Sequence, residues 1–60
     1  MTNLRKIRKG SGITQEELAN RLGGSRRAVV YREARGVVRA ATAQRYAVVL
    51  GFPPFQLLER

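Results

Sequence analysis

The sequence predicts a small all-α domain of five short helices. The chain has 60 residues, and a chain of that length buries only about 60% of the surface that its unfolded form exposes. Apolar residues recur at helical spacing, and glycines separate the periodic segments. We therefore expect one compact domain, residues 1–60, with a single core, short loops and no strand.

The charge balance predicts an acidic partner. Twelve lysines and arginines stand against four glutamates, which gives a net charge of +8 and a pI near 11.6. Such a surplus favours nucleic acid first and an anionic membrane second. The apolar runs are too short for a membrane span and the opening MTNLRKIRKG is too polar for a signal peptide, so we expect a cytoplasmic protein.

The residue types argue against catalysis. The chain has no cysteine, histidine or aspartate, so a disulfide framework, a zinc site, a serine triad and a carboxylate-histidine relay are unavailable. The stretch GSG at 10–12 lacks the lysine and hydroxyl residue that follow in a phosphate-binding loop. We expect neither an enzyme nor a metal or cofactor site.

The first two predicted helices lie on either side of that glycine stretch. The first covers Thr2 to Lys9, with Arg8 on the apolar side, where a charge needs a buried partner. The second begins at Thr14, which forms a capping box with Glu17, and runs to about Leu22. Its inner face consists of Leu18, Ala19 and Leu22, and Gly23 and Gly24 end it.

Three more helices follow. Ser25 is a good N-cap for a helix that reaches about Arg35, with Gly36 as its stop. A fourth helix is expected from about Ala40 to Leu50, burying Ala43, Tyr46, Ala47 and Leu50. The two prolines at 53 and 54 suit the start of a short fifth helix that carries Phe55, Leu57 and Leu58.

The middle of the chain, about 14–35, predicts two helices joined by a tight turn. Gln15 is followed by a small residue, a glycine and an apolar residue at Ala19, Gly23 and Val29. The small side chain lets a crossing helix approach, the glycine supplies a positive φ in the turn, and the valine packs the second helix onto the first. This is the pattern of a helix-turn-helix.

On these residues the chain resembles the Cro/repressor-type, or xenobiotic-response-element-type, helix-turn-helix family of prokaryotic and phage regulators. LRKIRKGSGITQEELANRLGGS is similar to the opening of that family, and LGFPPFQLLE is similar to its fourth-to-fifth helix junction. The resemblance implies a compact lambda-repressor-like domain that binds double-stranded DNA sequence-specifically. It also implies a transcriptional regulator, expected to be a repressor that acts as a homodimer at the nucleoid on a near-palindromic operator.

Candidate DNA contacts follow from the third helix. Arg26 and Arg27 place two positive charges at the positive end of the helix dipole with no local anion to offset them, which indicates DNA as the missing anion. Arginine pairs with guanine and Tyr31 can reach a base methyl or a phosphate, so these three are the expected base contacts. The resemblance assigns backbone contacts to Gln15, Thr14, Ser25, Arg35 and Arg39. Alternatively, the arginines are solvated surface charges.

The resemblance further pairs Arg8 with Glu33 as a structural ion pair between the first and third helices. The chain also departs from the family, because Gly24 and Arg32 stand where apolar side chains are usual. Either the stem of Arg32 lies along the core, or the third helix is rotated so that Val30 and Ala34 face inward.

The C-terminal residues predict a dimer contact. Phe52, Phe55 and Leu58 offer more apolar surface than one short helix buries, and Val48 lies off the inner face of the fourth helix. The alternative is that they close the core. Two other functions stay open: a basic segment that coats membranes, and an antitoxin or bridging module whose main partner is a protein.

Overall fold

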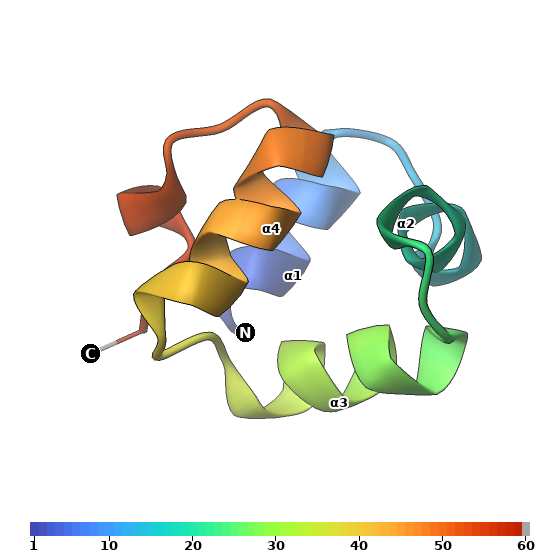
Figure 1. Ribbon diagram of the computed structural model, residues 1–60, viewed down its shortest axis with the longest axis horizontal. Coiled ribbons are helices and arrows are strands. Elements are labelled where there is room, and N and C mark those ends of the chain that lie inside the picture. The colour runs from blue at the N-terminus through green and yellow to red at the C-terminus, as the bar shows by residue number, and fades with distance from the viewer. Residues whose placement is uncertain (60) are drawn as a thin grey trace.

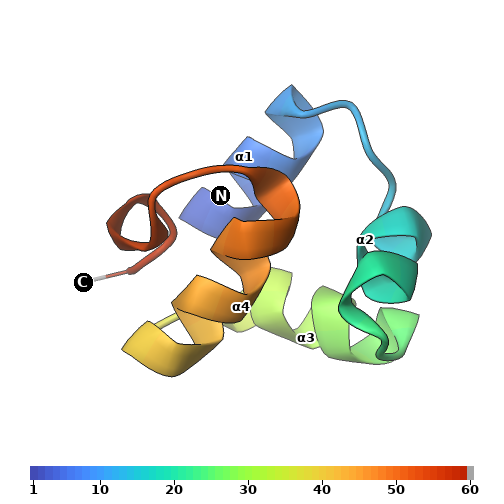
Figure 2. The ribbon, with the colours of Figure 1, turned by 45° about the horizontal axis from the view of Figure 1, so that its top comes forward.

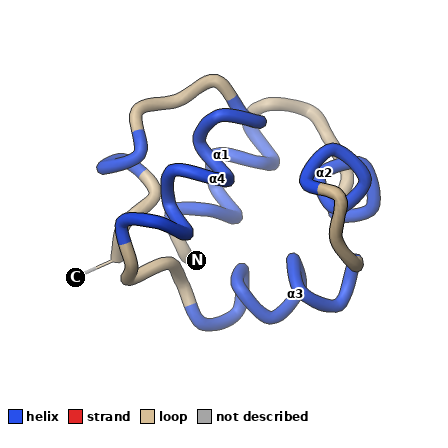
Figure 3. The backbone as a smooth tube through the Cα atoms, in the orientation of Figure 1, coloured by secondary structure: helices blue, strands red, loops and turns tan. Residues whose placement is uncertain are grey.

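The computed structural model describes residues 1–59 and contains four α-helices followed by a single 3-10 turn (Figure 1). In Figure 1, α1 lies behind α4, α3 runs across the bottom of the view and α2 closes its right side; Figure 3 shows the same path with loops between the helices. No helix in this part of the chain is long and apolar enough to cross a membrane. The elements are α1 (Asn3–Gly10), α2 (Gln15–Leu22), α3 (Arg26–Arg35), α4 (Ala40–Leu50) and the turn η1 (Pro54–Gln56).

The helices begin where side chains can satisfy the free backbone amides. The hydroxyls of Thr2, Thr14 and Ser25 each accept a hydrogen bond from the amide three residues ahead. At α2 the capping box is complete, because the Glu17 carboxylate also accepts from the Thr14 amide at 2.9 Å. Gly23 ends α2 with a φ of 75°, the left-handed conformation that glycine adopts without strain. The bounds predicted for the second, third and fourth helices agree with those of α2, α3 and α4.

The predicted fifth helix is wrong. Pro54–Gln56 forms only a 3-10 turn, because the residues that would continue it pair with a distant part of the chain. Leu58 forms an isolated parallel bridge with Val37, and the Glu59 amide donates to the Val37 carbonyl at 2.7 Å. Within residues 1–59 this pairing is a single isolated bridge and not part of a strand.

The C-terminal segment folds back beside α1 (Figure 2). The Asn3 side-chain amide donates to the Leu58 carbonyl at 2.9 Å. The segment passes so close to Gly36, which has a φ of 91°, that a Cβ there would lie 2.5 Å from the Cγ of Glu59. Only glycine fits at the end of α3 for both reasons. The segment thus fixes the positions of α1 and the linker between α3 and α4.

The core draws on every α-helix. Arg8 and Glu33 are the only charged residues buried among its apolar side chains in residues 1–59. Leu22 and Leu50, expected on inner faces, are half-buried and pack against its edge. The buried apolar residues are Leu4, Leu18, Ala19, Val29, Val37, Ala43, Tyr46, Ala47 and Leu57.

Candidate nucleic-acid interface

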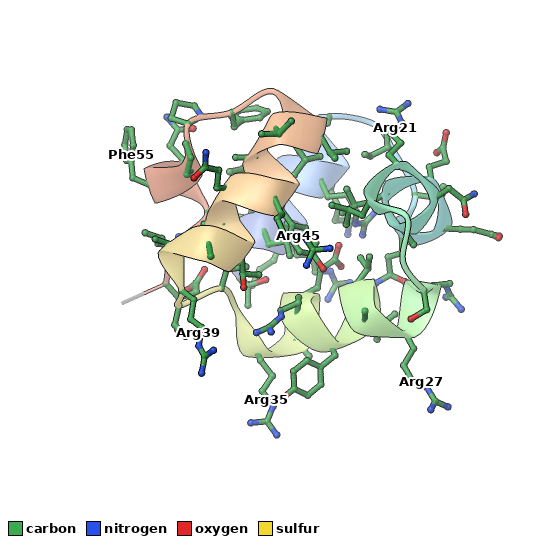
Figure 4. The ribbon with its side chains drawn as sticks, in the orientation of Figure 1. Arg21, Arg27, Arg35, Arg39, Arg45 and Phe55 are labelled. Atoms are coloured by element: carbon green, nitrogen blue, oxygen red, sulfur yellow. The ribbon has the colours of Figure 1, made fainter. Side chains whose placement is uncertain are left out.

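The outer face of α3 presents cations to solvent. Val29 and Glu33 are buried on its inner side, and residues four apart share a helix face. Arg27, Tyr31 and Arg35 therefore lie together on the side away from the core, where all three are exposed. Figure 4 shows the side chains of Arg27 and Arg35 pointing outward below α3, and that of Arg39 pointing the same way below the start of α4. We call Arg26, Arg27, Tyr31, Arg35 and Arg39 the basic face.

The rotation of α3 is settled by its half-buried arginine. Arg32 is intermediate in burial, whereas Val30 is 41% exposed and Ala34 is exposed. The alternative in which Val30 and Ala34 face inward is therefore wrong. The half-burial of Arg32 agrees instead with the alternative in which its stem lies along the core.

The two arginines that open α3 have no acidic neighbour in its first turn. Arg26 Nη2 lies 3.4 Å from the side-chain oxygen of Gln15, a neutral acceptor. Within residues 1–59 the one ion pair joins Arg8 and Glu33. The positive charge at the positive end of the α3 dipole is thus uncompensated inside the described structure.

Arg8 and Glu33 form a buried ion pair between α1 and α3. Arg8 Nε and Nη2 donate to the two carboxylate oxygens of Glu33, and Nη1 donates to the Ile13 carbonyl at 2.7 Å. Gln15 Nε2 donates to Glu33 Oε1 at 3.0 Å. The charges are buried but hydrogen-bonded, which is the condition for tolerating them in a core. The group fixes α1, the start of α2 and α3 relative to one another.

Gln15 has contacts that sequence reasoning missed. Its side chain bridges Glu33 and Arg26, so it connects the buried ion pair to the first residue of α3. A helix-start glutamine in sequence carries no signal of a partner eighteen residues away. Its expected contact with a DNA phosphate stays a prediction.

The hydroxyls of Thr14 and Ser25 are used as caps. Each accepts a hydrogen bond from a backbone N–H of its own helix, yet a hydroxyl keeps its hydrogen for donation to a phosphate.

Two arginines of α3 lie close to the Tyr31 ring. The guanidinium of Arg35 lies 5.1 Å from the ring centre, and that of Arg32 lies 5.7 Å from it. These contacts orient the ring and cations together.

The expected dimer residues differ in exposure. Phe55 is 71% exposed, Val48 is 76% exposed and Phe52 is also exposed. Leu58 is half-buried and packs against the core, so much of its surface is already covered within the chain. In Figure 4, Phe55 lies far from the arginines of α3.

The family comparison agrees with this geometry. Residues 4–57 match the family model described as Helix-turn-helix. The chain belongs to the lambda-repressor-like, Cro/repressor-type helix-turn-helix family. In this helix-turn-helix domain, α2 and α3 are the two motif helices and residues 23–25 are the turn. Membership implies DNA binding in transcriptional regulation and a typically non-enzymatic domain. Comparisons with curated proteins and with solved structures gave no match.

Proposed function

We propose that the chain is the sequence-specific double-stranded DNA-binding domain of a transcriptional repressor, with α3 inserted in the major groove. The observation that carries the proposal is the pair Arg26 and Arg27, uncompensated at the exposed start of the second motif helix. Residues 1–60 act as one domain in the cytoplasm. A homodimer places two copies of α3 on a near-palindromic operator, about 34 Å apart.

Base reading is assigned to the first turns of α3. The fork of an arginine guanidinium matches guanine O6 and N7, and Arg27 lies on the outermost line of the helix. Arg26 lies nearer α2, where its hydrogen bond to Gln15 holds its direction. Tyr31, one turn after Arg27, reaches a thymine methyl or a phosphate.

Backbone contacts flank the base-reading turn. The free amides at the start of α2 form an anion site with Thr14 and Gln15 beside it, and Ser25 lies at the start of α3. Arg35 and Arg39 extend on the other side of the basic face. These groups hold the duplex in register and carry no base information.

The test is selection of bound duplexes from a random pool, followed by titrations of two variants. Selection should enrich a near-palindromic site. Arg27→Ala should cost about 1–3 kcal/mol on that site and much less on random duplex, because a guanine contact is lost only where the guanine exists. Arg39→Ala is the matched control, which should weaken both duplexes to a similar degree.

Three outcomes would contradict the proposal. No enrichment over the starting pool would remove sequence-specific reading. Equal loss on both duplexes for Arg27→Ala would make this arginine a backbone contact. An affinity that hardly changes with salt would exclude phosphate contact, because each neutralised phosphate contributes about 0.9 to the slope of log affinity against log salt.

A further inference from the structure

A cavity of about 440 Å³ opens between α3, α4 and the turn that precedes α3. Its floor is apolar, formed by Ala19, Leu22 and Val29. Arg32 and Arg45 line it from α3 and α4, and Figure 4 shows Arg45 extending from α4 toward α3. Its volume falls in the range of small-molecule sites, about 300–1,000 Å³.

The cavity is positively charged and has free donors. None of its lining residues is acidic, and within residues 1–59 the guanidinium groups of Arg32 and Arg45 make no hydrogen bond or ion pair. The Arg32 guanidinium lies 5.7 Å from the ring centre of Tyr31, which also lines the cavity. Tyr46 also lines the cavity; burial raises the pKa of its phenol, while the two guanidiniums oppose that shift. The phenol is therefore a neutral donor beside two cations.

Gly24, at the cavity wall, does not have the backbone conformation that requires a glycine. Gly24 lies outside the left-handed region, unlike its neighbour Gly23. Gly24 lines the cavity, and a Cβ there would meet nothing within 4 Å, so a larger side chain is accommodated without a clash. The missing side chain at Gly24 and the charged one at Arg32 together leave the cavity open and cationic.

We propose that this cavity binds a small amphipathic organic anion, an aromatic carboxylate or sulfonate. The ring covers the apolar floor, and the acid group accepts hydrogen bonds from Arg32, Arg45 and the Tyr46 hydroxyl. The apolar floor distinguishes this ligand from bare phosphate, which would leave it uncovered. Ser25, Arg27 and Tyr31 of the proposed DNA interface also line the cavity, so the two sites share an edge. Ligand binding to the free protein, without DNA, tests the cavity separately from the proposed function.

The test uses the fluorescent aromatic anion anilinonaphthalene sulfonate with the free protein. It should bind saturably at one site per chain, and its uncharged counterpart phenylnaphthylamine should bind about tenfold more weakly because it lacks the charged acceptor. Arg45→Gln should weaken the sulfonate by about tenfold and leave phenylnaphthylamine unchanged. Arg5→Gln, an exposed arginine on α1, removes the same charge outside the cavity and should have no effect.

Filling the cavity gives a second test. Gly24→Leu should abolish binding of both dyes while the circular dichroism spectrum shows a folded helical chain. The proposal is overturned if Arg45→Gln and Arg5→Gln weaken the sulfonate equally, if folded Gly24→Leu still binds it, or if no saturable binding occurs. Displacement of the dye by equimolar inorganic phosphate would likewise overturn the requirement for an apolar body.

Discussion

At the scale of single residues, burial decides what an arginine does in this domain. Arg8 is 9% exposed and its partner Glu33 is 4% exposed, so the guanidinium needs the carboxylate and the Ile13 carbonyl. Arg27 is exposed and has no acidic neighbour in its turn. The same side chain is thus structural on α1 and available for a partner on α3.

Arg8→Ala should destabilise the fold by about 3–5 kcal/mol, because it leaves the Glu33 carboxylate buried without its cation. Urea denaturation followed by circular dichroism measures the loss. Arg5→Ala, an exposed arginine on the same helix, is the control and should change stability little. Equal stability of the two variants would show that the buried pair does not hold α1 to α3.

Glu17 predicts a pH dependence of stability. The hydrogen bond from the Thr14 amide lowers its pKa below the ordinary value of 4.5. A carboxyl whose pKa is lower in the folded state contributes stability above the unfolded pKa and loses it as pH falls through the folded pKa. As pH is lowered below 4.5, the thermal unfolding midpoint of the native chain should therefore fall more steeply than that of Glu17→Gln. Parallel curves would exclude a charged capping box.

At the scale of the elements, local chemistry made the helices predictable and long-range pairing did not. Thr14, Ser25 and Gly23 act within one turn of their own helices, so sequence shows where α2 and α3 begin and end. The C-terminal turn depends on Val37, about twenty residues away along the chain, and its pairing has no local signature.

Part of the candidate site could likewise be predicted from the sequence, and part of it needed the structure. The exposed line through Arg27 follows from helical spacing once α3 is placed. The bridge from Gln15 to Glu33 and Arg26 needs the packing of three helices, and spacing does not reveal it. The register of Arg32 also needed the structure, because either face of α3 could have been buried on pattern alone.

The conformation of the turn between α2 and α3 predicts that replacing its two adjacent glycines by alanine has opposite effects on stability. Gly23→Ala should cost roughly 1–2 kcal/mol, because its φ of 75° is strained for an alanine. Gly24→Ala should stabilise by about 0.4–1 kcal/mol, because its backbone and surroundings accept a methyl group and the unfolded chain loses freedom. Thermal unfolding of the two variants compares them directly, and a loss of similar size in both would contradict the assigned turn conformation.

At the scale of the whole molecule, the basic and apolar surfaces lie apart. The basic face follows α3, whereas Val48, Phe52 and Phe55 belong to α4 and the segment after it. Figure 4 shows Phe55 on the far side of the molecule from Arg27. A second copy docked on the apolar residues would leave the basic face of each chain free for its own half-site.

The dimer is therefore expected through Phe55 and its exposed neighbours, with Leu58 excluded as a probe because its replacement would disturb the core. Phe55→Lys and Val48→Lys should each shift sedimentation toward the monomer, because a charge in an apolar contact must be desolvated without a partner. Val38→Lys changes an equally exposed valine on the linker before α4 and should leave association unchanged. If the native chain sedimented as a monomer both free and on DNA, no such contact would exist. If only Val48→Lys released monomers, the contact would lie on α4 and the C-terminal turn would simply close the core.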